Sequence, residues 1–159
     1  MRRALAPLVL AAIVLLGGCG VGTGGVEDGG APPTGLAAGP TLYLVDDAGH
    51  LRADERGTGR LGTVLGAVQL LLADTDPAAP DLHSEIPETT TRAIVEDTGD
   101  TVAVYLPLRR ADLTPVAADQ ILCTAAGVVA ASGRDLTEVT ISLHPTHGGP
   151  VTRPCPVLG

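Results

Sequence analysis

The chain of 159 residues has no lysine, phenylalanine or tryptophan, and its only aromatic rings besides histidine are Tyr43 and Tyr105. Surfaces that stack nucleic-acid bases or sugar rings usually present exposed aromatic side chains, so this composition argues against both kinds of binding. The net charge of −8 also argues against the basic face that a phosphate backbone requires. We therefore expect no nucleic-acid partner, and a core of aliphatic side chains around the two tyrosines.

Signature motifs of catalysis are also missing. None of Ser84, Ser132 and Ser142 lies in a Gly-x-Ser-x-Gly turn, and no glycine-rich stretch joins a strand to a helix as in a phosphate-binding loop. His144 and His147 are the best candidates for metal ligands or a general base, but no carboxylate follows closely enough to complete a metal site. We expect two solvated turn histidines, no metal, no cofactor and no enzymatic activity.

Charged pairs in the sequence have simple structural interpretations. The acid pairs fall in expected turns or at a helix terminus, where carboxylates accept backbone N–H groups, and they lack the spacing of a calcium loop: Asp46-Asp47, Asp74 with Asp76, and Glu96-Asp97. Arg109-Arg110 could contact a phosphate, a carboxylate or a partner protein, but such a pair ordinarily lies in solvent. We assign none of these residues to a site.

The N-terminal segment has the features of an export signal. Arg2 and Arg3 precede the apolar run Leu5 to Leu16, which has the length of a secretory signal core but is too short to span a membrane comfortably. Leu16-Gly17-Gly18-Cys19 resembles a lipobox, in which the cysteine thiol accepts a diacylglycerol and residues 1–18 are removed. The alternative is an ordinary cleaved signal peptide followed by a cysteine without lipid. We expect Cys19 to anchor the mature chain at the extracytoplasmic face of the cell membrane.

Residues 19–39 are rich in glycine, contain Pro32 and Pro33, and have few large apolar side chains. Such a segment buries too little surface to offset its ordering entropy, so we expect a flexible tether with a reach of roughly 25 Å. Residues 40–159 form the expected single domain, because one core suffices for this length.

Two cysteines remain when Cys19 is lipidated. Cys123 and Cys155 are an even pair in a compartment that permits oxidation, and we expect a disulfide between them. The alternatives are two buried thiols, or a metal pair that lacks a third and a fourth ligand.

Hydrophobic periodicity indicates an α+β domain with the order β-α-β-β-α-β, one mixed sheet packed on two helices. Apolar residues recur at helical spacing from Leu61 to Leu72, and Thr114-Pro115 is typical of a capped helix start. The turn sequence Asp97-Thr98-Gly99-Asp100 predicts a hairpin. The predicted strands cover residues 41–45, 92–95, 101–106 and 138–143, followed by an extended segment that ends at Cys155.

Several segments together resemble the GerMN domain of bacterial envelope and sporulation lipoproteins, over about Pro40 to Leu143. They are Leu42-Tyr43-Leu44-Val45-Asp46, Leu70-Leu71-Leu72-Ala73, Ser84-Glu85-Ile86-Pro87, Thr101-Val102-Ala103-Val104-Tyr105-Leu106 and Asp119-Gln120-Ile121-Leu122-Cys123-Thr124. Cys123 and Cys155-Pro156 are similar to cysteines of actinobacterial variants. The resemblance implies a small exported α+β domain, often lipid-anchored, that assembles envelope protein complexes or acts near the cell wall. It supplies no catalytic residues.

The sequence thus favours a non-catalytic lipoprotein with envelope proteins or the cell wall as partners. One alternative is a hydrolase acting on cell-wall material through His144 or His147 with a nearby acid. Another is a lipoprotein that binds a small ligand or a metal, which would need a deep pocket lined by polar side chains.

Overall fold

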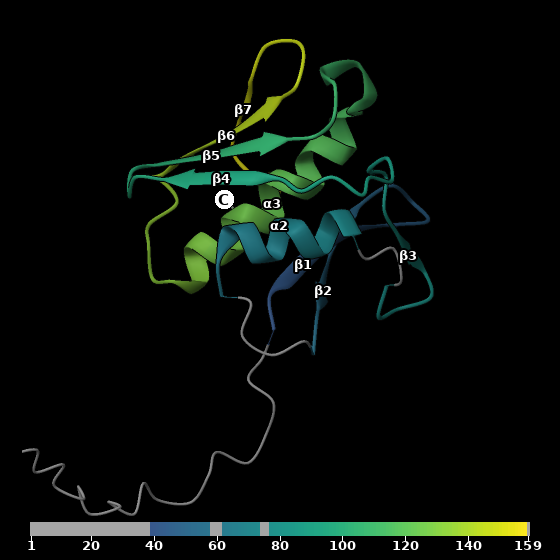
Figure 1. The fold of residues 1–159 in the computed structure, drawn as a ribbon. Helices are drawn as coiled ribbons and strands as arrows, with labels where there is room; N and C mark the ends of the chain where they lie inside the picture. Colours follow the sequence, from purple (N-terminus) through teal and green to yellow (C-terminus); the bar gives the residue numbers. More distant parts are fainter. Residues whose placement is uncertain (1–38, 58–61, 74–76, 159) are drawn as a thin grey trace, which may run out of the picture. The chain divides into compact units, whose positions relative to one another are not determined.

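The structure is a computed structural model that describes residues 39–57, 62–73 and 77–158. These residues form two β-sheets and two α-helices (Figure 1). Cys19, the expected signal peptide and the expected tether up to residue 38 lie outside the described residues, so lipidation and export stay predictions. No helix within the described ranges is long and apolar enough to cross a membrane.

The first sheet is antiparallel, with the strand order β2-β1-β3. Its strands are β1 (Thr41–Asp46), β2 (Leu51–Glu55) and β3 (Leu82–His83). Asp46 shapes the turn between β1 and β2, because its carboxylate accepts the N–H groups of Ala48 and His50 at 3.0 and 2.8 Å. The pKa of Asp46 is lowered to about 2, first of all by the hydrogen bond from the N–H of His50. Hydrogen bonds from the Arg52 side chain and from the N–H of Ala48 also lower it. Gly49 completes the turn with a φ of +81°, which favours glycine.

The second sheet is mixed, with the strand order β4-β5-β6-β7. Its strands are β4 (Ile94–Asp97), β5 (Thr101–Leu106), β6 (Thr140–Pro145) and β7 (Val151–Thr152). β5 and β6 are parallel, and the two other pairs are antiparallel. A hydrogen bond from the N–H of Thr98 to the C=O of Thr101 closes the predicted hairpin between β4 and β5. The parallel pair requires a crossover connection, which contains the longest described helix.

The two helices are α2 (Val64–Ala73) and α3 (Pro115–Ala131), the latter preceded by the short 3₁₀ helix η1 (Arg110–Asp112). α3 begins as predicted: the hydroxyl of Thr114 accepts the N–H of Ala117 at 3.0 Å, and Pro115 occupies the first turn. The helices pack on one another, and in Figure 1 they lie on the same side of the second sheet. The core is formed between these layers from leucine, valine, isoleucine and alanine side chains.

Two buried polar residues of α3 join this helix to β1. β1 pairs with β3 at only two positions. Nearer the start of β1, the hydroxyl of Thr124 accepts the N–H of Tyr43 at 3.0 Å. The amide of Gln120 donates to the carbonyl of Tyr43 at 3.1 Å and accepts the N–H of Glu85 at 2.8 Å. Thr124 and Gln120 are fully buried, so their hydrogen bonds are made within the core. Side chains of a helix therefore satisfy backbone groups that a longer β3 would otherwise pair.

The connection after β6 packs tightly against η1. The N–H of Arg110 donates to the carbonyl of His147, and the N–H of Thr146 donates to the carbonyl of Leu108. Gly148 has a φ of +97°, and a Cβ atom there would lie only 2.6 Å from the Cβ of Arg110. Backbone conformation and close approach both require glycine at this position.

A disulfide joins Cys123 of α3 to Cys155 near the end of the described chain. Both residues are buried, and the bond fastens the segment after β7 to the helix. This is the pairing that the sequence predicts, and neither free thiols nor a metal pair is present at these positions.

The α+β class is confirmed, but the number of sheets and the bounds of several strands differ from the expectation. The strand expected at residues 92–95 covers Ile94–Asp97, so Glu96 and Asp97 lie in a strand and not in the expected turn. The expected single sheet is divided into two, because β1 forms hydrogen bonds with β2, β3 and α3 and not with the strands of the second sheet. β2 and β3 were not predicted. The last predicted strand, residues 138–143, begins two residues later, at Thr140, because residues 136–138 form a turn.

Candidate interaction surface

The face of the second sheet opposite the helices carries side chains from three neighbouring strands. Along β5, Val102, Val104 and Leu106 are buried toward the helices, and the alternation of a strand turns Tyr105 to the other face. The register places Tyr105 between Ile94 of β4 and His144 of β6.

Ile94 and Tyr105 are exposed side by side on this surface. Their exposed fractions are 63% and 38%, and they are two of the four large hydrophobic residues that the described part of the chain leaves exposed. Next to them lie two small residues, Ala103 and Ser142, which pair across β5 and β6 and are buried. We name the side chains of Ile94, Glu96, Ala103, Tyr105, Ser142 and His144 the open face.

A network of polar contacts orders the open face. The hydroxyl of Tyr105 donates to the carboxylate of Glu96 at 3.0 Å, and this hydrogen bond raises the pKa of Tyr105 because it stabilises the protonated phenol. The ring of His144 lies against the ring of Tyr105, with 4.9 Å between their centres. Nε2 of His144 lies 2.9 Å from the hydroxyl oxygen of Ser142. The tyrosine is thus held from both sides, which reduces the entropy lost when a partner covers it.

One of the two candidate histidines does not occupy the position expected from the sequence. His144 was expected to be a solvated turn residue, but it lies in β6, half-buried and stacked on Tyr105. His147 is exposed in the following turn, as expected. Within the described residues no carboxylate forms a hydrogen bond with His144 or His147, since Glu96 bonds to Tyr105 instead. His144 and His147 therefore lack the acid partner that the hydrolase alternative requires of them. A histidine that does lie near a carboxylate is His83, whose Nε2 atom is 3.2 Å from Oε1 of Glu85 at the exposed surface.

Other charged candidates are engaged within the fold. Arg109 forms a double hydrogen bond with the carboxylate of Asp112, and Arg110 donates to the carbonyl of Leu113. In residues 39–57, 62–73 and 77–158 there is no group of three or more histidine, cysteine, aspartate or glutamate residues that could hold a metal ion.

Ile94 is not among the residues singled out from the sequence, and Glu96 and Ser142 are considered there only as a turn acid and as a serine outside a nucleophile motif, without assignment to a site. Residues 101–106 alternate visibly in the sequence, but which residues adjoin Tyr105 depends on the registers of β5 with β4 and β6. The signal available in the sequence is an isoleucine placed between Arg92 and Glu96 in a predicted strand.

Comparisons of the chain with protein-family models, with curated proteins and with solved structures found no match.

Proposed function

We propose that this chain is an extracytoplasmic lipoprotein, anchored through Cys19, whose GerMN-like domain acts by binding envelope proteins or the cell wall and not by catalysis. The observation that carries the proposal is the open face, where Ile94 and Tyr105 are exposed next to one another. The buried centres of interfaces are more apolar than the rest of the surface, are enriched in aromatic side chains such as tyrosine, and have a polar rim. Glu96 and His144 provide polar groups beside Tyr105 here.

The anchoring part of the proposal rests on the sequence. The lipobox-like Leu16-Gly17-Gly18-Cys19 follows an apolar run of signal-peptide length, and residues 19–39 would serve as the tether to the domain. The disulfide between Cys123 and Cys155 supports an oxidising compartment, because such bonds rarely persist in a reducing cytosol.

Membrane fractionation of cells that express the chain tests the anchoring. We expect the wild type in the membrane fraction with lipid on Cys19, and the Cys19→Ser variant in the soluble exported fraction. An unprocessed wild type in the cytosol would contradict the proposal.

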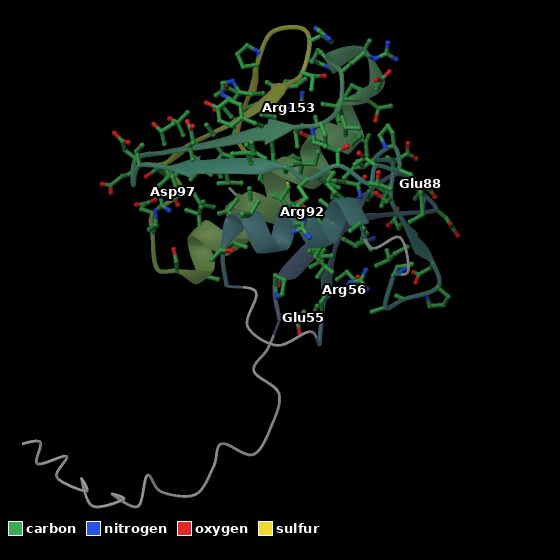
Figure 2. The ribbon with its side chains drawn as sticks, in the orientation of Figure 1. Glu55, Arg56, Glu88, Arg92, Asp97 and Arg153 are labelled. Carbon is green, nitrogen blue, oxygen red and sulfur yellow. A yellow bond between two sulfur atoms is a disulfide. The ribbon has the colours of Figure 1, made fainter. Side chains whose placement is uncertain are left out.

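Photocrosslinking in intact cells tests the binding part. A photoreactive amino acid at position 94, on the open face, should crosslink to envelope components. The matched control is position 55, an exposed site on β2 of the other sheet, labelled in Figure 2. Equal crosslinking from both positions, no crosslinking from position 94, or turnover of cell-wall material by the purified chain would each count against the proposal.

A further inference from the structure

The outer edge of β4 has no neighbouring strand in the described part of the chain. Thr98 and Thr101 form a hydrogen-bonded pair, and along an antiparallel hairpin such pairs alternate with pairs that are not hydrogen-bonded. The backbone N–H and C=O groups of Ile94 and Glu96 therefore face β5. The N–H and C=O groups of Val95 and Asp97 therefore point away from the sheet. They are the groups that an added strand would bind.

A groove runs between this edge and α2. It consists of two adjoining hollows of about 460 and 390 Å³, which share Thr63 and Leu65 as lining residues. Leu65, with 43% of its surface exposed, and Leu70 line it from α2, and Val95 lines it from β4. A strand added to β4 would direct every second side chain into this groove, because side chains alternate between the two faces of a sheet.

The side chain of Gln69 already bonds to the segment leading into β4. Its Oε1 atom accepts the N–H of Ala93 at 3.1 Å, where the carbonyl of an additional strand would accept. An amide of α2 thus takes the place of a strand at the beginning of the edge and leaves the edge at Val95 and Asp97 to a partner.

Arg92 gives the groove a charge. Of the seven arginines that the structure describes, six have a polar partner, and Arg92 has none within the described residues. The six pairs are Arg52–Asp46, Arg56–Asp54, Arg109–Asp112, Arg110–Leu113, Arg134–Asp97 and Arg153–Asp119. Arg92 is exposed, lines the groove with α2 residues, and is drawn beside α2 in Figure 2. An unpaired guanidinium in an acidic protein is suited to bind a carboxylate.

We propose that the groove binds an extended segment of a partner protein as an added strand on β4. Backbone hydrogen bonds to Val95 and Asp97 hold the segment, apolar side chains at alternate positions contact Leu65 and Leu70, and an aspartate or glutamate side chain pairs with Arg92. This inference rests on the proposed function, because it specifies the kind of partner that the domain binds.

A displayed library of random ten-residue peptides, selected against the exported full-length chain carrying Cys19→Ser, tests the inference. We expect enriched peptides with alternating apolar residues and one acidic residue at a fixed position. The Arg92→Glu variant should bind these peptides about tenfold or more weakly, and should itself select a basic residue at that position. The control Arg109→Glu makes the same change of charge outside the groove and should leave the selection unchanged.

Two further variants test the added strand itself. Val95→Pro removes an N–H that points away from β5, so it should abolish peptide binding and keep the circular dichroism spectrum of the fold. Leu65→Glu places a charge in the groove without changing the backbone, and should abolish binding even if the proline variant fails to fold. Failure to enrich any peptide, or equal binding by the wild type, Arg92→Glu and Leu65→Glu, would overturn the inference. So would a dimer, detected by sedimentation, that Leu65→Glu dissociates, since the occupant would then be a second copy.

The crosslinking experiment distinguishes this inference from the proposed function. Crosslinks from position 94 that persist in the Arg92→Glu and Leu65→Glu variants would leave the proposed function standing and refute the groove. Loss of these crosslinks in both variants, with retention in Arg109→Glu, supports the two together.

Discussion

Replacing Thr124 by valine tests whether the hydrogen bonds between α3 and β1 stabilise the fold. Valine has nearly the shape of threonine, so the fully buried site stays filled, but the N–H of Tyr43 loses the acceptor that lies at 3.0 Å. A buried N–H without a partner costs about 1–3 kcal/mol, and we expect the free energy of unfolding to fall by that amount. Packing alone predicts almost no change.

Urea unfolding of the Cys19→Ser chain, followed by far-ultraviolet circular dichroism because the chain has no tryptophan, measures this difference. The control Thr124→Ser keeps the hydroxyl and removes a methyl group, at a cost of about 0.5–1.5 kcal/mol. Amide hydrogen exchange separates the two causes: the N–H of Tyr43 should stay protected in Thr124→Ser and exchange faster in Thr124→Val. A Thr124→Val variant as stable as the wild type, with Tyr43 still protected, would refute the reasoning.

Three further predictions concern stability. Replacing Cys123 and Cys155 together by alanine opens a loop whose ends lie 32 residues apart, and should cost about 3.7 kcal/mol on the chain-entropy estimate; unchanged urea midpoints would contradict this. The pKa of Asp46 is about 2 in the fold and 3.8 ordinarily, so the ionised carboxylate stabilises the folded state. In acid unfolding curves, the free energy by which the wild type is more stable than Asp46→Asn should be complete above about pH 5. It should disappear as the pH falls from about 4 to 2. The added methyl group of Gly99→Ala meets open space, so this variant should lose only the roughly 1–2 kcal/mol of stability that an unfavourable positive φ costs. Gly148→Ala should lose about 1–3 kcal/mol more, because its Cβ atom would overlap with the side chain of Arg110. Equal thermal midpoints of the two variants would exclude that overlap.

Local signals in the sequence predicted the elements whose ends are set by local chemistry. Thr114 and Pro115 predicted the start of α3 because a hydroxyl acceptor and a fixed φ act within one turn. Gly99 predicted the hairpin for the same reason, since a positive φ is needed between β4 and β5.

β2 was not predicted from the sequence because most of its residues are polar. Leu51–Glu55 forms a strand through pairing with β1, and its one buried residue is Asp54, which pairs with Arg56 at 2.8 Å. Because the buried residue of this strand is an aspartate, its sequence does not show the alternation of apolar and polar residues that predicts a strand. The division into two sheets was missed for a related reason: the hydrogen bonds of Gln120 and Thr124 with Tyr43 join residues far apart in the sequence.

The open face could be predicted only in part. Alternation in β5 separates Tyr105 from Val102 and Val104, but the contact with His144 follows from a parallel pairing across the whole of α3. The edge of β4 and the groove beside α2 likewise depend on which strand is outermost, and a single sequence does not encode that order in any local pattern.

The position of α3 has a consequence for how the domain could be divided. This helix contacts β1 of one sheet and β6 of the other, and its buried side chains belong to a core common to both. Neither sheet therefore keeps its hydrophobic support if the polypeptide is cut before Thr114. We therefore expect that neither sheet folds as an independent module, and that removal of the helix unfolds both sheets together.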